Sequence, residues 1–477
     1  MVRTAMDMID HICPIPRNEC IGDGKAGTTM GRLQGRKKRE PFVLEHASIA
    51  TGDEKGTVQK DMSVLVSADG RIEQVCPTPL AYVPSGYHRI NATGKFVAPG
   101  LINAHTHLFA DGKPLSGGTD LSPRVVDAAL KVVHSPAGKV LMDARIKGNV
   151  STLLNSGVTT IRTLGDVGYE AVRLRDKIDA DELTGPRMLA AGPLLAIPGG
   201  HGDPFIALSC SSPEEARRRT RENLDHGVNA IKVAATGGVT DATKLGEAGS
   251  PQMTEEEMAA VCDEAHEFGV LVAAHAQSPE GVKAALKAGV DTIEHGSALD
   301  DEMIGLFLDN PRSLRGFSAL DPTLSAGLPL VKISQQELGI SDIVRGNSEL
   351  VVDGMVKSAK QAHENGIAVG VGTDTGMTFV PQYSTWRELD YLVRYADFTP
   401  AQAFHGATQV NARNLGFDNV TGSVDTGKDA DLIVLDEDPA KNVRTLADPK
   451  LVIVRGKPVW RPEVKHFEEI DRLLDSF

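Results

Sequence analysis

The sequence predicts an α/β protein in which a (β/α)8 TIM-like barrel is inserted in a small β-sandwich formed by N- and C-terminal strands. Short alternating strands with turn signals begin at residue 42, and strands return after residue 416. Between them, short apolar runs alternate with stretches of helical periodicity, a pattern typical of a (β/α)8 barrel. Because such a barrel takes about 250 residues, the 477-residue chain has room for both units.

The chain divides into three predicted parts. Residues 1–41 are polar and glycine-rich and carry the basic run Arg36–Arg39, so we expect an irregular N-terminal arm. Residues 42–97 and 416–477 are expected to form the split β-sandwich domain, and residues 98–415 the (β/α)8 catalytic barrel. The two β segments should pair with each other in space.

Eight barrel strands are expected, each an apolar run that precedes a turn or a helical stretch. In chain order they are Leu101–His105, Val158–Leu164, Arg187–Ala191, Ala230–Ala235, Leu271–Ala274, Thr292–His295, Leu314–Ala319 and Ile367–Gly372. The seventh contains Arg315 and Gly316, which are unusual in a strand buried on both faces. After a helical segment over Pro400–Leu415, strands are expected again at Ala430–Leu435 and Leu451–Arg455.

Composition and short motifs exclude several functional classes. The chain has 50 Lys and Arg against 64 Asp and Glu, and its net charge of −14 would repel nucleic acid. No stretch reaches the roughly 18 apolar residues of a membrane span. The five cysteines include no Cys-x-x-Cys pair and the N-terminus lacks the apolar core of a secretory signal, so we expect a cytoplasmic protein. Phosphate-binding glycine fingerprints and the Gly-x-Ser-x-Gly elbow are also absent from the sequence.

Residues of the metal-ligand type fall where barrel strands are expected to end. In chain order they are His105, His107, Lys232, His275, His295 and Asp374. In an extended segment residues i and i+2 point to the same side, so His105 and His107 can reach one ion. The carboxyl ends of barrel strands meet at one mouth, where enzymes of this fold have their active sites. The sequence therefore predicts a metal site at that mouth.

Lys232 is the unusual member of this group. As an ammonium it has no lone pair and would repel a divalent cation held by its neighbours. It either lies beside the site as a charge, or it loses its proton and reacts with carbon dioxide. The resulting carbamate would present two oxygens that can bridge two metal ions.

The strand-end residues stand in motifs that resemble those of the metal-dependent amidohydrolase superfamily, and the resemblance extends from about Phe42 to Trp460. The motifs of the superfamily are Val97–His107, Ile231–Val233, His275, Glu294–Gly296 and Gly372–Asp374. A second set is similar to the branch that holds Xaa-Pro dipeptidases, ochratoxinase-type amidases and imidazolonepropionase-like proteins. These motifs are Gly200–Asp203, Ala234–Gly238, Pro322–Leu324 and Ala407–Gly416.

The resemblance implies a binuclear centre with two divalent metal ions per chain, expected to be Zn²⁺. The ligands that it implies are His105, His107 and Asp374 for the buried ion, His275 and His295 for the outer ion, and N6-carboxylated Lys232 as the bridge. The expected partner is a small-molecule substrate, with no nucleic acid and no membrane. We further expect the chain to form a homo-oligomer.

The expected activity is hydrolysis of an amide or peptide C–N bond in a small substrate, a dipeptide or an N-acyl amino acid, by a hydroxide activated on the metal. Asp374 would act first as general base and then as general acid. His201, in the loop after the third strand, would donate to the developing oxyanion, or it would only order its glycine-rich loop. Gly237 and Gly238 would let the backbone approach a substrate carboxylate.

Two other functions are weighed against this one. The first is a cyclic-amide hydrolase or deaminase that acts on a small heterocycle. A mononuclear deaminase needs a Glu near the strand-five or strand-six histidine, whereas Glu294 directly precedes His295 and is expected to point to the outer side of the barrel. The second is a metal-stabilised barrel that binds without turnover, which the presence of Asp374 beside a histidine cluster disfavours.

Overall fold

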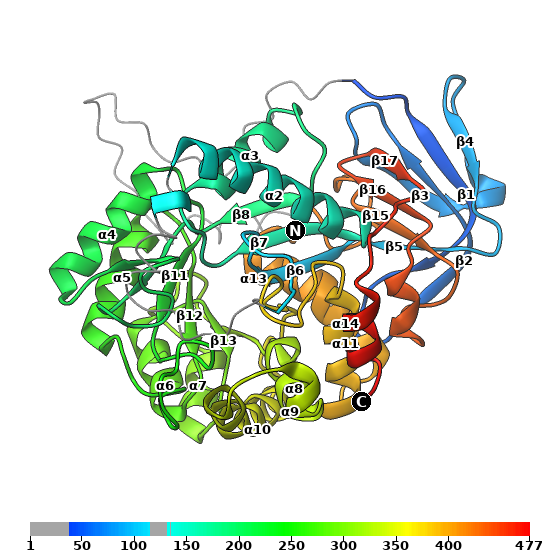
Figure 1. Ribbon diagram of the computed structural model, residues 1–477. Helices are drawn as coiled ribbons and strands as arrows, with labels where there is room; N and C mark the ends of the chain where they lie inside the picture. Colours follow the sequence, from blue (N-terminus) through cyan, green and yellow to red (C-terminus); the bar gives the residue numbers. More distant parts are fainter. Residues whose placement is uncertain (1–37, 115–130, 134) are drawn as a thin grey trace, which may run out of the picture.

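The computed structural model describes residues 38–114, 131–133 and 135–477. A barrel lies next to a β-sheet in which the first strands of the chain run beside the last ones (Figure 1). This arrangement confirms the fold class predicted from the sequence. The arm predicted at residues 1–41 lies almost entirely outside the described residues.

The sheet beside the barrel contains strands from both ends of the chain. Its strands are β1 (Phe42–Ala50), β2 (Val58–Val66), β3 (Ile72–Pro77), β4 (His88–Asn91), β5 (Phe96–Pro99), β15 (Leu432–Leu435), β16 (Leu451–Val454) and β17 (Lys457–Trp460). The order is β17-β16-β15-β5-β1-β2-β3, and β4 pairs with β1. The two ends meet where β15 runs antiparallel to β5, with Leu432 opposite Pro99. Val97, Leu432 and Ile453 belong to one apolar cluster, so burial of apolar area joins the two segments.

The barrel is built from parallel strands with helices on the outside. The strands are β6 (Leu101–Thr106), β7 (Val158–Thr163), β8 (Arg187–Ala190), β9 (Leu194–Ala196), β10 (Ala207–Ser209), β11 (Ile231–Ala234), β12 (Val272–Ala276), β13 (Thr292–His295) and β14 (Ala319–Asp321). They form two sheets, β6-β7-β8 and β10-β9-β11-β12-β13-β14. Two strands that are consecutive in the chain, β8 and β9, share the third position of the barrel. The first pairs with β7 and the second pairs with β11.

The helices follow the strands as the periodicity predicts. They are α2 (Pro136–Asn155), α3 (Glu170–Asp179), α4 (Pro213–Asp225), α5 (Glu255–Glu267), α6 (Pro279–Ala288), α7 (Asp301–Leu308), α8 (Leu324–Lys332), α9 (Gln335–Leu338), α10 (Asp342–Glu364), α11 (Thr385–Tyr395), α12 (Pro400–His405), α13 (Asn411–Leu415) and α14 (Glu468–Leu474). Shorter helical turns are η1 (Thr78–Leu80), η2 (Gly406–Val410) and η3 (Val443–Ala447). Thr254 begins α5 with a capping box that includes Glu257, a typical start signal. Within the described ranges, no helix has both the length and the apolar character needed to cross a bilayer.

Two barrel strands differ from their predicted positions. The seventh was expected at Leu314–Ala319, but β14 spans Ala319–Asp321, because Gly316 has a φ of 77° and stands in a turn. The eighth was expected at Ile367–Gly372 and is not a regular strand. Two single bridges, Leu320 with Val369 and Thr106 with Thr375, close the barrel there.

A side chain explains why the eighth segment is irregular. Asn411 accepts a hydrogen bond from the Val371 N–H at 3.2 Å and donates to the carbonyls of Val371 and Ile102, each at 2.8 Å. It therefore takes the Val371 N–H, which a strand ladder would otherwise use, whereas the Val371 carbonyl still accepts from the Ala104 N–H at 2.9 Å. A Cβ at Gly370 would stand 2.3 Å from Oδ1 of Asn411, so glycine is required for this approach.

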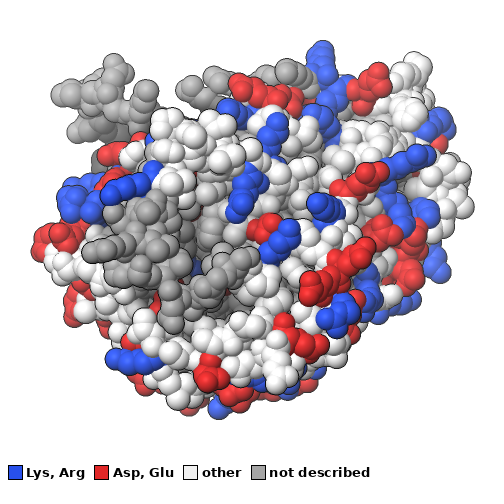
Figure 2. Space-filling model, in the orientation of Figure 1, with Lys and Arg blue, Asp and Glu red and all other residues white. Residues whose placement is uncertain are grey.

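On the face seen in Figure 2, acidic and basic side chains are interspersed over the helices. This mixed surface accompanies the net charge of −14.

Candidate metal centre

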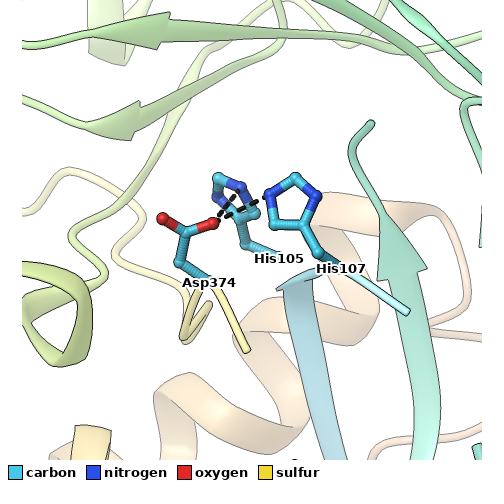
Figure 3. A group of neighbouring side chains, drawn as sticks. All are labelled: His105, His107 and Asp374. Carbon is cyan, nitrogen blue, oxygen red and sulfur yellow. Dashed lines mark ion pairs between the residues drawn. The ribbon is translucent and has the colours of Figure 1, made fainter. Parts of the chain in front are cut away.

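The mouth of the barrel holds His105, His107 and Asp374 (Figure 3). His105 lies in β6 and His107 directly follows that strand, so both rings reach the same side. Oδ1 of Asp374 is 2.8 Å from Nε2 of His107 and 3.3 Å from Nε2 of His105. Two imidazole nitrogens and one carboxylate oxygen that converge in this way form a donor set suited to a metal ion such as zinc.

Hydrogen bonds behind the two rings fix which nitrogen faces the site. Nδ1 of His107 donates to the carbonyl of Gly165 at 3.0 Å, because a carbonyl can only accept. Nδ1 of His105 lies 2.8 Å from Oε2 of Glu294. With Nδ1 of His107 protonated, the lone pair of its Nε2 points toward Asp374, and the carboxylate of Glu294 beside Nδ1 of His105 favours the same tautomer there. Such outer partners commonly orient metal-binding histidines.

His295 and His275 are held by similar partners. The Thr323 hydroxyl donates to the carbonyl of Pro322 at 2.8 Å and is 2.6 Å from Nδ1 of His295. Thr323 therefore accepts from Nδ1–H, which leaves Nε2 of His295 with its lone pair. Nε2 of His275 lies 3.3 Å from the Gly237 carbonyl, so in His275 it is Nδ1 that keeps its lone pair.

The histidine rings form a continuous row across the mouth. The ring centroids of His105 lie 5.3 Å from those of both His107 and His295. The centroid of His275 lies 4.6 Å from His295 and 4.0 Å from His201. The fold thus brings together the four histidines expected as ligands, together with His201. Among the described residues, the group with ligand atoms close enough to share one ion is His105, His107 and Asp374.

Lys232 lies inside the barrel on β11, with 1% of its surface exposed. In the described part of the chain, its ammonium nitrogen has no hydrogen-bond partner. Burial lowers the pKa of Lys232 to about 8, against the attraction of Glu294 and Asp374, which would raise it. A buried, unpartnered amine is costly in the charged form, and this cost lowers the pKa of Lys232 below its ordinary value.

Burial and charge set the protonation states of the neighbouring groups. Burial holds the pKa values of His105 and His275 well below their ordinary value and lowers the pKa of His295 to about 4. These rings are therefore neutral at pH 7, as ligands must be. Burial alone would raise the pKa of Asp374, but His105 and His107 hold it well below its usual range.

The backbone at two of these residues is left-handed. His295 has a φ of 70° and Asp374 a φ of 62°, values that are costly for residues other than glycine and that often occur at functional sites. The turn at His295 interrupts the alternation of β13. The side chain of His295 therefore reaches the mouth although it does not continue the alternation on which Thr292 and Glu294 point into the barrel.

The expectation that Glu294 faces the outer side of the barrel is wrong. Glu294 is fully buried inside, where Oε1 accepts from Nη2 of Arg162 at 2.8 Å and from the Thr292 hydroxyl at 2.7 Å. The prediction applied strict alternation from His295 backwards, and the left-handed turn at that residue invalidates it. A left-handed histidine leaves no signal in sequence periodicity.

His201 lies at the edge of the row, between the loops after β9 and β11. Nδ1 of His201 contacts Asp241, and its ring stacks on His275. A Cβ at Gly238 would stand 2.5 Å from Nδ1 of His201, so glycine makes room for this ring. The N–H of Gly237 donates to the carbonyl of Ser250 at 2.9 Å and is thus already engaged.

Sequence reasoning missed the residues that support the site. They are the Gly165 carbonyl, Asp241, Glu294 and Thr323. Glu294 and Thr323 stand in the motifs Glu294–Gly296 and Pro322–Leu324, but the sequence gives no sign that they support the histidines. The others lie in loops or inside the barrel, and their contacts depend on tertiary geometry.

Comparison with known proteins supports the same family. The model of the amidohydrolase family matches residues 96–459. A crystal structure from Bifidobacterium longum, provisionally named a prolidase, is 57% identical, covers 92% of this chain and 99% of that one, and has a TM-score of 0.82. The structure of a Xaa-Pro dipeptidase with methionine bound in its active site is 26% identical, covers 88% of this chain and 100% of that one, and has a TM-score of 0.75.

A relative of different specificity is also similar. The ochratoxinase of Aspergillus niger is 27% identical over 381 residues, which are 74% of this chain and 73% of that protein. The family model covers well over half of the chain and includes the strands that carry the histidines, Lys232 and Asp374. The chain therefore belongs to the amidohydrolase family and is an enzyme of that family.

Proposed function

We propose that this enzyme hydrolyses an amide C–N bond whose leaving amine belongs to an amino acid, as in an Xaa-Pro dipeptide or an N-acyl amino acid. The observation that carries the proposal is the row of imidazoles beside an anionic Asp374 inside one mouth, in which burial keeps His105, His275 and His295 neutral. The 57% identity to a protein provisionally named a prolidase supports the dipeptidase type of substrate.

The proposed cofactor is a pair of divalent ions, expected to be Zn²⁺. His105, His107 and Asp374 would hold one ion, His275 and His295 the other, and carboxylated Lys232 would lie between them. The fit rests on the free lone pairs of the four rings and on the unpartnered nitrogen of Lys232. When bound, the ions would lower the pKa of a water molecule to about 7 and polarise the scissile carbonyl.

Asp374 would move the proton. Its low pKa keeps Oδ1 anionic at neutral pH, so it can accept a proton from the attacking water. The same carboxyl group would then deliver that proton to the leaving nitrogen. Its left-handed backbone directs the carboxylate at the two rings and away from the path of a regular strand.

His201 would stabilise the developing oxyanion. The pKa of Asp241, which burial would raise, is lowered by His201, so Asp241 is an anion beside Nδ1. Asp241 beside Nδ1 fixes the orientation of the ring. Nε2–H is then the donor that remains for a substrate oxygen. Gly237 would contribute by holding His275 through its carbonyl, and Gly238 by leaving room for His201.

The cyclic-amide hydrolase or deaminase is the weaker candidate. Although Glu294 lies inside the barrel, its Oε1 accepts from Arg162 and Thr292 and its Oε2 faces Nδ1 of His105. Both oxygens thus face side chains of the barrel, Arg162 and Thr292 on one side and His105 on the other. The geometry therefore favours cleavage of a linear amide.

The test is turnover by metal-replete protein of Xaa-Pro dipeptides, N-acyl amino acids and small cyclic amides, with products identified by mass. We expect release of a free amino acid from a member of the first two groups. The C-terminal amide of a cleaved substrate should be a poorer substrate, because groups that meet the carboxylate would be left unpaired. Ring opening or ammonia release from a heterocycle, without dipeptide turnover, would instead support the alternative function.

A further inference from the structure

A charged network that the proposed reaction does not use lies beneath the histidines. Arg162 on β7 is fully buried, and its Nε donates to the carbonyl of Ala104 at 2.7 Å. Its Nη1 donates to the Thr292 hydroxyl at 3.0 Å. Its Nη2 donates to Oε1 of Glu294 at 2.8 Å and to Oδ2 of Asp321 at 2.9 Å.

Glu294 connects this network to the candidate metal centre. One carboxylate oxygen, Oε1, accepts from Arg162 and from Thr292. The other, Oε2, is 2.8 Å from Nδ1 of His105, whose Nε2 faces Asp374. The same side chain therefore contacts a fixed guanidinium on one side and a predicted metal ligand on the other.

We propose that Glu294 is a positioning residue of the metal centre. It holds the ring of His105 in the tautomer that turns Nε2 toward the ion, while Arg162 holds Glu294 in place. The inference rests on the proposed function only in assuming that His105 binds a metal. Orientation of a ligating imidazole by a carboxylate on its other nitrogen raises metal affinity.

A carboxylate suits this position because its two oxygens have different neighbours. Oε1 accepts from Arg162 and Thr292, and Oε2 is in ion-pair contact with Nδ1 of His105 at 2.8 Å. A glutamine amide would place an NH₂ group against one of these donors. Glutamine is therefore a close match in size that removes one of the two contacts, whereas aspartate keeps both acceptor oxygens on a shorter stem.

Asp321 provides the matched control. It lies opposite Glu294 in the pairing of β13 with β14, it is equally buried, and it binds the same Nη2 of Arg162. Among the described residues, its ion pairs and hydrogen bonds do not include a histidine. If Glu294 serves only as a hydrogen-bond partner of Arg162, the substitutions Glu294→Gln and Asp321→Asn should have the same consequences.

The experiment measures metal binding without substrate. Wild type, Glu294→Gln, Glu294→Asp and Asp321→Asn are stripped of metal, and their affinities for Zn²⁺ are determined by competition with a chromophoric chelator. The visible absorption spectrum of each Co²⁺-loaded protein reports ligand geometry. Thermal unfolding of the metal-free proteins confirms that each variant folds.

We expect Glu294→Gln to bind Zn²⁺ about 10- to 100-fold more weakly than wild type, which is the usual loss when an outer partner of a metal ligand is removed. The variant should also have an altered Co²⁺ spectrum. Glu294→Asp should recover part of this loss. Asp321→Asn should keep wild-type affinity and spectrum. If Glu294→Gln does not fold, a weaker affinity of Glu294→Asp than of Asp321→Asn carries the same meaning.

Equal losses in Glu294→Gln and Asp321→Asn would overturn the proposal, and so would wild-type affinity and spectrum in the Glu294 variants. Turnover is not part of the readout. A wild-type enzyme that binds metal but cleaves no dipeptide or N-acyl amino acid would contradict the proposed substrate. The metal-binding data would still decide the role of Glu294. A wild-type protein without metal affinity would overturn both proposals.

Discussion

The sequence predicted some residues of the site correctly and misplaced others. His105, His107 and Asp374 were identifiable because a ligand residue at a strand end has few other uses in an apolar barrel. Glu294 was misplaced because the left-handed turn at the next residue is set by tertiary packing. Periodicity locates side chains only as far as the strand remains regular.

Asp374→Asn tests the proton-transfer role. Asparagine keeps the shape of the side chain but cannot accept the proton, so we expect kcat to fall by at least about 10²-fold. Elemental analysis should accompany the kinetics, since the residue is also a proposed ligand. A variant with normal metal content, an unchanged kcat and an unchanged pH profile would contradict the mechanism.

Gly238→Ala tests the position of His201. The added Cβ would meet Nδ1 of His201 at 2.5 Å and displace the ring. Misplacement by about 1 Å can cost as much as 10²-fold in rate, so we expect a clear fall in kcat/KM with unchanged metal content. Gly305→Ala on α7 is the control, because a Cβ there meets nothing within 4 Å. Equal activity of the two variants would show that His201 has only a structural role.

At the scale of elements, α11 anchors the loop that orients His295. Glu388 on α11 is fully buried and accepts the N–H groups of Leu324 and Ser325, both at 2.7 Å. These N–H groups begin α8, whose N-cap Thr323 makes no capping bond of its own and instead accepts from His295. Glu388 therefore caps the helix from outside and fixes Thr323 in its left-handed conformation.

Glu388 also predicts a pH dependence of stability. Burial raises the pKa of Glu388 from 4.5 to about 7. The folded protein thus holds this proton more tightly than the unfolded chain, and the associated stabilisation is lost as the pH rises through that interval. Glutamine at this position cannot titrate. The Tm of the wild type should therefore fall relative to the Tm of Glu388→Gln as the pH rises from about 5 to about 8. Thermal unfolding at several pH values gives the measurement, and a difference independent of pH would contradict it.

The elements were predictable where propensity and packing agree. The predicted sixth strand coincides with β13, and the first, second, third and fourth overlap closely with β6, β7, β8 and β11. The seventh and eighth strands were predicted less well, because Gly316 forms a turn and because Asn411 takes the Val371 N–H of the eighth segment. A side chain that bonds a backbone group in place of a neighbouring strand depends on tertiary packing, so the local sequence pattern does not reveal it.

At the scale of the whole molecule, buried ion pairs join the barrel to the sheet. Nη2 of Arg187, at the start of β8, is 2.6 Å from Oδ2 of Asp429 and 3.2 Å from Oδ2 of Asp431. Oδ1 of Asp431 accepts the backbone N–H of Arg455, and the Arg455 guanidinium pairs with Asp179 of the barrel at 2.7 Å. Residues far apart in the sequence therefore meet in one charged interface, which composition and periodicity do not reveal.

Removal of Arg187 measures how strongly this interface joins the two units. Arg187→Met keeps much of the side-chain volume but withdraws the cation from two buried carboxylates, so we expect a loss of about 3–5 kcal/mol, as for other broken buried pairs. Arg217→Met is the control, since its ion pair with Asp263 is half-exposed on both sides and should contribute at most about 1 kcal/mol. Thermal unfolding should give a much lower Tm for Arg187→Met than for Arg217→Met. Similar values would mean that apolar burial around Ile433 and Val452, which share one cluster with Val158 of the barrel, holds the two units together more than charge does.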